Sequence, residues 1–231
     1  MPEAMPEYTR FAVYYAPAPG PFADFCASWL GWDAALGRPS PHPDIPGLPR
    51  PLTEITQTPR KYGFHATLKP PFRLTGTRAA LERDLAALAA RLAPAQMPGL
   101  ALTRLGAFLA LTPTGDTERL SELAAETVRA LDRHRAPPTA AELARRRNAR
   151  LSPSQEANLD RWGYPYVMQD FRFHLTLTGR LSPAQAEQTR AALAPVLAPL
   201  LPAPFRVDAL SLFGEASDGW FHLLHRYALT D

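Results

Sequence analysis

One five-residue pattern occurs twice in this chain, once in each half. Residues 64–68 and 173–177 both read Phe-His-x-Thr-Leu, where x is any residue. Side chains two apart in a strand point to the same face, so each histidine shares a polar face with its threonine, opposite an apolar face. This repetition constrains the fold more than any other feature, because it predicts a duplicated structural unit.

The same order of elements follows both histidines. After a strand at 62–69 come a helix at 78–92, with leucines at helical spacing, and two short strands around Gly106. After a strand at 171–178 come a helix at 183–197 and strands at 205–213 and 220–229. We therefore expect an α+β fold of two pseudo-symmetric lobes of antiparallel sheet, with outer helices and a central cleft between the histidine strands.

The whole chain, residues 1–231, is expected to form a single bilobal domain. Lobe 1 covers about 8–116 and lobe 2 about 171–231. The segment 117–170 has no counterpart in the repeat, and we expect it to be mostly helical, bridging the lobes and covering the cleft. Three helix starts carry a capping pair: Thr139 with Glu142, Ser152 with Gln155, and Ser182 with Gln185.

Composition excludes several classes of protein. With 46% hydrophobic and 20% charged residues the chain is globular, and the lack of a run of 18 apolar residues argues against a membrane span. Cys26 is the only cysteine, which excludes an internal disulfide and a four-cysteine zinc site. Residues 1–10 lack the apolar core of a signal peptide, so we expect a cytoplasmic protein.

The two histidines suit acid–base chemistry at a phosphate ester. Their ordinary pKa near 6.5 lets one ring take a proton while the other gives one at neutral pH. His65 and His174 are therefore the candidate catalytic pair. This chemistry needs no metal or other cofactor, and the sequence has no cluster at metal-ligand spacing.

Other residues of the predicted polar faces suit phosphate binding. The hydroxyls of Thr67 and Thr176 can hydrogen-bond phosphoryl oxygens, and Lys69 and Arg172 can offset their negative charge. The formal net charge of +3 permits an anionic ligand without requiring nucleic acid. A basic run at 145–147, with Arg150, is interpreted as a solvated helix face, with contact to the substrate or an anionic partner as the alternative.

The paired pattern resembles the 2H phosphoesterase superfamily, which is named for two His-x-[Ser/Thr]-x motifs in a duplicated α+β fold. The residues around the motifs, at 61–72 and 161–166, are similar to a branch encoded in bacterial phosphonate-utilisation operons. The resemblance spans most of the chain. It implies that His65 and His174 are catalytic and that Thr67 and Thr176 bind phosphate.

The resemblance implies a metal-independent cyclic phosphodiesterase, a phosphoric diester hydrolase that opens 5-phosphoribosyl 1,2-cyclic phosphate. Its partner would be this small phosphoester, whose second phosphate needs further cations such as Lys69 and Arg172. Two alternatives stay open. One is the same chemistry on RNA ends or 2′,3′-cyclic nucleotides, as in enzymes called 2′-5′ RNA ligases; the other is a nucleotide- or RNA-binding module without turnover. The roles of the two histidines and the oligomeric state also stay open.

Overall fold

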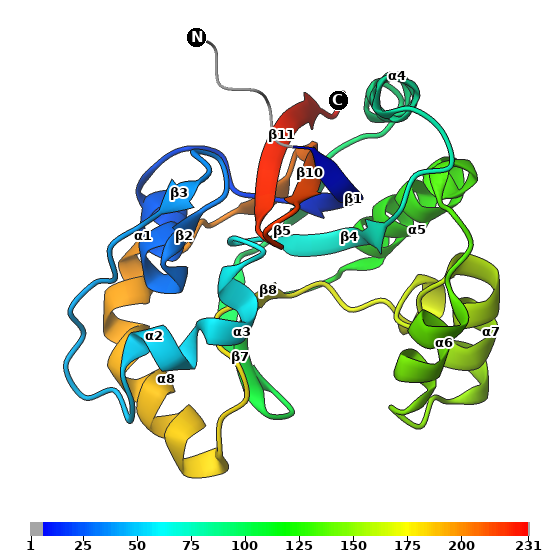
Figure 1. Cartoon of the computed structure of the whole chain (residues 1–231). Coiled ribbons are helices and arrows are strands. Elements are labelled where there is room, and N and C mark those ends of the chain that lie inside the picture. Colours follow the sequence, from blue (N-terminus) through cyan, green and yellow to red (C-terminus); the bar gives the residue numbers. More distant parts are fainter. Residues whose placement is uncertain (1–6, 231) are drawn as a thin grey trace, which may run out of the picture.

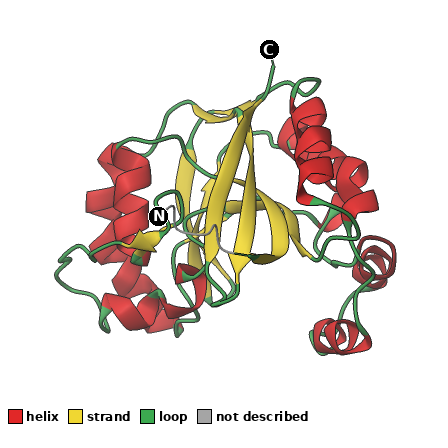
Figure 2. Cartoon of the chain, turned by 45° about the horizontal axis from the view of Figure 1, so that its top comes forward, coloured by secondary structure: helices red, strands yellow, loops and turns green. Residues whose placement is uncertain are grey.

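The computed structural model describes residues 7–230, with antiparallel strands in the middle and helices on both sides (Figures 1 and 2). This confirms the predicted α+β class with antiparallel sheets. The expectation of no signal peptide concerns residues 1–10, of which 1–6 lie outside the described residues. Within 7–230, every helix is too short or too polar to cross a membrane.

The aromatic stretch near the start of the chain forms an inner strand of the larger sheet. This strand, β1 (Tyr8–Tyr15), pairs antiparallel with a neighbour on either side. Its second half is buried, which explains its aromatic and β-branched residues, because such residues pack well on a covered pleated surface. The order of the sheet is β11-β10-β1-β4, with β4 at Ala66–Phe72, β10 at Ala209–Ala216 and β11 at Phe221–Ala228.

The second sheet holds the strand of the second histidine. β6 (Leu100–Leu105) and β7 (Phe108–Pro113) form the hairpin predicted around Gly106, whose positive φ of 58° suits glycine. β8 (Leu175–Thr176) pairs antiparallel with β7. Two further short pairs are β5 (Ala95–Met97) with β9 (Phe205–Val207), and β2 (Trp32–Asp33) with β3 (Arg38–Pro39).

The strands do not sort into sheets by their position in the chain. β6 and β7, which precede residue 117, pair with β8, whereas β10 and β11 from the end of the chain lie beside β1. Each of these two sheets therefore combines early and late segments. Periodicity in a sequence identifies the buried face of a strand but not its partner, so the sequence could not show this interleaving.

The helices lie outside the sheets (Figure 2). The three predicted capping pairs all form, each with both reciprocal hydrogen bonds. The helices are α1 (Pro21–Leu30), α2 (Leu52–Ile55), α3 (Gln57–Arg60), α4 (Arg78–Ala89), α5 (Glu118–Leu131), α6 (Ala140–Arg147), α7 (Pro153–Trp162) and α8 (Pro183–Leu197). Short 3-10 turns are η1 (Asp132–His134), η2 (Met168–Asp170) and η3 (Ala198–Leu200).

A continuous core joins the two histidine strands. Trp29 of α1 is fully buried, and its indole N–H donates to the carbonyl of Leu177 at 2.8 Å. The ring of Phe205 packs against Tyr15 of β1 at 5.3 Å and against Phe173 at 5.7 Å, between centroids. The relative placement of the two strands is thus set by packing on residues from distant parts of the chain.

Thr178 ties the chain that leaves β8 to β7. Its buried hydroxyl accepts from the Leu109 N–H at 3.0 Å and donates to the Gly179 carbonyl at 2.8 Å. Thr178→Val keeps the shape of the side chain but removes the hydroxyl that accepts the hydrogen bond from the Leu109 N–H. We expect it to lower the free energy of unfolding by about 1–3 kcal/mol. Urea unfolding measures this, with the exposed Thr230→Val as a control expected to change stability by about 0.5 kcal/mol or less. Equal losses in both variants would contradict the role of burial.

Candidate functional site

The two histidines are anchored in the same way, although they come from different sheets. Each stands one residue before its strand, β4 or β8. The Nδ1 of His65 lies 2.9 Å from the carbonyl oxygen of Gly63, and the Nδ1 of His174 lies 2.8 Å from that of Arg172. A carbonyl only accepts hydrogen bonds, so each Nδ1 carries the hydrogen. The Nε2 of each ring is left for other partners.

His65 is held against the ring of Tyr14. The two rings stack with 3.9 Å between centroids and 25° between planes, and the ring of Tyr62 lies 5.9 Å away. Burial lowers the pKa of His65 to about 4; the charge of His174 acts in the same direction, and the bond to the Gly63 carbonyl opposes both. His65 is therefore a neutral imidazole at pH 7, with an Nε2 lone pair that can accept a proton.

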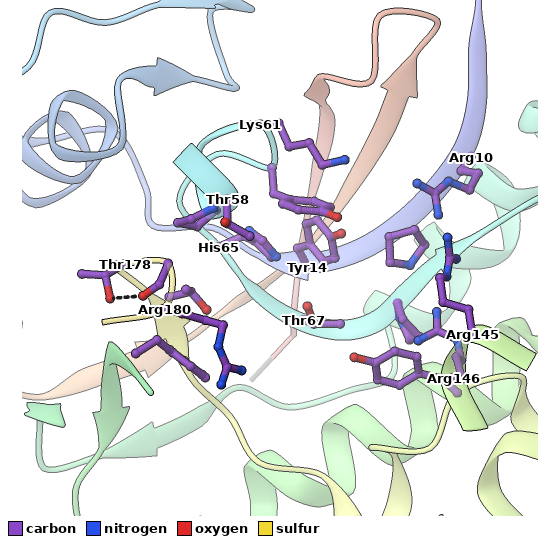
Figure 3. A pocket seen from close by; sticks show the side chains of 18 residues that line it. Arg10, Tyr14, Thr58, Lys61, His65, Thr67, Arg145, Arg146, Thr178 and Arg180 are labelled. Atoms are coloured by element: carbon purple, nitrogen blue, oxygen red, sulfur yellow. Dashed lines mark hydrogen bonds between the residues drawn. The ribbon is translucent and has the colours of Figure 1, made fainter. Parts of the chain in front are cut away.

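A cavity of about 550 Å³ opens beside His65 (Figure 3). The two threonines of the repeated pattern, Thr67 and Thr176, line it together with His65. His174 is not among the lining residues. Its ring packs against Phe108, which does line the cavity, with 5.8 Å between centroids. Of the two histidines and two threonines in the repeated pattern, three thus line one cavity, and the fourth, His174, lies next to its wall.

The described lining of the cavity carries five cations and no carboxylate. Figure 3 shows arginines on both sides of the central His65 and Thr67. Lys61 and Arg180 stand a few residues from the repeated patterns. That proximity was the only feature of the sequence that could have predicted them as lining residues. No three His, Cys, Asp or Glu side chains within residues 7–230 are grouped to hold a metal ion. The five cations are Arg10, Lys61, Arg145, Arg146 and Arg180.

Lys69 does not reach this cavity. β1 pairs Val13 with Lys69 but Tyr14 with Thr67, so β4 contains an extra residue at this point, a β-bulge. The bulge breaks the alternation of faces and turns Lys69 inward, where it is 1% exposed. Its ammonium group lies 3.3 Å from the carboxylate of Asp132. The face predicted for Lys69 is therefore wrong, because the period of two ends at the bulge.

Lys69→Met is expected to leave stability unchanged or to raise it, by up to about 3 kcal/mol at pH 7. Burial lowers the pKa of Lys69 to about 8 although Asp132 opposes the shift, so the charged amine is costly to bury. Arg135, 2.8 Å from Asp132, still pairs that carboxylate in the variant.

The wild type and Lys69→Met are also expected to differ in how their stability depends on pH. The folded-state pKa of Lys69 lies below its ordinary 10.5, so wild-type stability rises from about pH 8 to pH 10.5, and the variant lacks this contribution. Urea unfolding at pH 7, 9 and 10 measures both effects. A loss of several kcal/mol on substitution at pH 7 would contradict this account.

Arg172 contributes its backbone to the site. Its side chain is exposed and is not among the residues that line the cavity, whereas its carbonyl accepts the hydrogen bond from His174. The predicted strand at 171–178 is reduced to Leu175–Thr176, because β7 pairs only with these two residues. Outside that short ladder, the side chain of Arg172 has no sheet to hold it over the cavity.

Two curated relatives align with most of this chain. One from Janthinobacterium sp. (strain Marseille) is 39% identical over 221 residues, which is 91% of this chain and 48% of the relative. One from Laribacter hongkongensis (strain HLHK9) is 35% identical over 213 residues, which is 91% of this chain and 49% of the relative. Both are named ribose 1,5-bisphosphate phosphokinase PhnN. The chain spans about half the length of these relatives.

Solved structures also resemble this chain. E. coli LigT complexed with 3′-AMP has a TM-score of 0.45 and 17% identity, over 97% of this chain and 100% of that chain. A structure described as a phosphoesterase has a TM-score of 0.44 and 15% identity, again over 97% and 100%. The two curated relatives, both named PhnN, confirm the resemblance to the phosphonate-utilisation branch that was predicted from the sequence.

The relatives overturn the function predicted from the sequence. Both carry the name of a kinase, and a kinase transfers a phosphoryl group from a nucleotide to an acceptor. That reaction differs from the predicted opening of a cyclic phosphodiester and from the nucleotide, RNA and binding-module alternatives. The prediction failed because paired histidines indicate proton transfer beside a phosphate group. They do not identify the group that accepts or donates the phosphate.

A family match covers more than half of the chain. It runs over residues 67–222, from the first threonine of the repeated pattern through the second pattern and into β11. This chain therefore belongs to the family described as "Protein of unknown function (DUF1045)".

Proposed function

We propose that this chain is an enzyme that carries out phosphoryl-group chemistry on a phosphorylated ribose. His65 and His174 move the protons, and Thr67 and Thr176 bind the phosphate group. The observation that carries the proposal is the identical backbone anchoring of the two imidazoles, one of which lines a cavity rich in hydroxyls and cations while the other packs beside its wall. Hydroxyls and cations are the groups that bind phosphoryl oxygens.

The surroundings of the two rings support different roles for them. His65 is neutral at pH 7 because burial lowers its pKa to about 4, so we propose that it takes the proton. His174 is only partly buried and packs beside the cavity wall, so we propose that it gives the proton. As the attacking hydroxyl oxygen bonds to phosphorus, its proton passes to Nε2 of His65. As the bond from phosphorus to the leaving oxygen breaks, Nε2 of His174 gives that oxygen a proton.

The names of the curated relatives support the choice of substrate class. Those relatives are named for ribose 1,5-bisphosphate, and we propose that the cleft of this chain takes a phosphorylated ribose of that kind. This chain aligns with about half of each relative. Its two lysines, Lys61 and Lys69, do not follow a glycine, as the lysine of a nucleotide-binding P-loop does. We propose that this chain supplies the part that handles the sugar phosphate.

We also propose that the two histidine strands are the equivalent parts of a duplicated fold. The shared Phe-His-x-Thr-Leu pattern and the shared bond from Nδ1 to the carbonyl two residues earlier support this. In this proposal residues 117–170 cover the cleft. α6, which belongs to that segment, supplies two residues of the cavity wall.

Phosphorus NMR tests the proposed activity. The purified chain is incubated with ribose 1,5-bisphosphate, with and without MgATP, and all phosphorus resonances are followed over time. We expect new resonances that appear in proportion to enzyme concentration and that require both histidines. Spectra that stay unchanged under both conditions, with a folded wild-type chain, would overturn the proposal.

A further inference from the structure

The basic run on α6 is divided between two surroundings. Successive residues on a helix are about 100° apart, so neighbouring arginines point in different directions. Arg147 bonds to the carboxylates of Glu156 and Asp160 on α7. Arg145 and Arg146 line the cavity instead. The run is therefore not one solvated face, since two of its cations belong to the wall of the cleft.

Arg146 is held in place without a paired carboxylate in the described residues. Its guanidinium carbon lies 4.4 Å from the centre of the Tyr164 ring, and the side chain is half-buried. Burial lowers the pKa of Arg146; the positive charges of Arg145 and Arg10 act in the same direction, and Tyr164 and Glu142 oppose them. Like charges are thus gathered at this end of the cleft.

Arg10 faces the same region from β1. Its Nε and Nη2 bond to the two carboxylate oxygens of Glu215, and the Nη2 bond measures 2.7 Å. A two-pronged ion pair of this kind fixes the plane of the guanidinium group. Nη1 takes no part in the pair and can donate to another anion, since arginine has five N–H donors.

We propose that Arg10, Arg145 and Arg146 form a second anion subsite that takes the distal phosphate of a bisphosphorylated ligand. This rests on the proposed function, in which the first phosphate lies at the histidines and threonines. Figure 3 shows the three arginines on one side of His65 and Thr67, away from Arg180. A phosphate among these arginines would offset their mutual repulsion and accept charge-assisted hydrogen bonds.

The inference selects a class of ligand. A monophosphate can occupy only one of the two anion positions, whereas a small sugar with a phosphate at each end can occupy both. The cavity of about 550 Å³ falls within the range of roughly 300–1,000 Å³ typical of small-molecule sites. The subsite therefore makes the cleft selective for a sugar bisphosphate over the corresponding monophosphate.

Calorimetric titration tests the subsite. Ribose 5-phosphate and ribose 1,5-bisphosphate are titrated into the wild-type chain, Arg146→Gln and the control Arg147→Gln, which changes the neighbouring arginine outside the cavity. We expect the wild type to bind the bisphosphate at least tenfold more tightly than the monophosphate. Arg146→Gln should weaken bisphosphate binding by about 10- to 100-fold and leave monophosphate binding within about twofold. Arg147→Gln should change neither. Arg145→Gln, at an exposed position, is a second variant in case Arg146→Gln unfolds.

The outcomes separate this inference from the proposed function. Equal wild-type affinity for the two ligands, or equal losses for both ligands in Arg146→Gln, would overturn the subsite and leave phosphate binding at the histidines intact. Selective loss of the bisphosphate, combined with unchanged phosphorus spectra, would support the subsite and refute the proposed activity. If neither ligand binds to the folded wild type, the subsite inference and the proposed function are both overturned. The double variant Thr67→Val/Thr176→Val should weaken the binding of both ligands, because these residues contact the phosphate that the ligands share.

Discussion

Alanine at His65 or at His174 is expected to slow turnover of the phosphorylated ribose by about 10²- to 10⁴-fold. Each substitution removes one of the two proposed proton-transfer groups, while the hydroxyls and cations of the cavity remain. If the two rings act in one concerted step, the double variant should be little slower than either single variant. Initial rates from phosphorus NMR at saturating substrate measure these effects.

A matched histidine provides the control for this prediction. His225 is exposed on β11, and its ring makes an edge-on contact with Tyr227, outside the cavity lining. His225→Ala should keep the wild-type rate. Because His65→Ala also uncovers the ring of Tyr14, His65→Gln is measured beside it to keep most of the side-chain volume. Rates within about threefold of wild type in the His65 and His174 variants would contradict their roles.

Acidification from pH 6.5 to pH 4 is expected to remove about 3 kcal/mol of stability through His65 alone. The pKa of His65 is about 4 in the folded chain because of burial, against an ordinary value of 6.5. In this window the unfolded chain binds a proton that the folded chain does not. Stability is therefore full above about pH 6.5 and falls as the pH drops toward 4.

Comparing wild type with His65→Gln isolates this contribution. Asp84, Asp132 and Glu142 also have lowered pKa values, and their acid-dependent losses are common to both proteins. Urea unfolding at pH 7, 5.5 and 4.5 should show a steeper decline in the wild type than in the variant. Parallel curves would mean that water reaches the imidazole and that its pKa stays near its ordinary value.

Local patterns in the sequence located most of the elements. Capping pairs placed the starts of α6, α7 and α8, because a side-chain bond to a backbone N–H is decided within four residues. The repeated pattern likewise pointed to His65, Thr67 and Thr176, which line one cavity, but it could not show that His174 packs beside the cavity wall instead.

Features that depend on contacts between distant parts of the chain could not be predicted from the sequence. The bulge in β4 that turns Lys69 inward depends on how Val13 and Tyr14 of another strand pair with it. Arg10 reaches the cavity because β1 lies beside β4, and nothing in its own neighbours in the sequence indicates that. The interleaving of early and late strands has the same origin, because pairing partners are chosen by packing in three dimensions.

The bonds that fix the two imidazoles have a consequence for the charge of the site. A backbone carbonyl holds each ring in position without neutralising it. When a ring is protonated, the phosphate of a bound ligand is then the natural counter-ion. Ligand binding and proton uptake are linked in such a site, so each raises the affinity for the other. In the proposed function, a filled cleft and an empty cleft thus hold different numbers of protons, and the ligand sets the charge state of the two histidines.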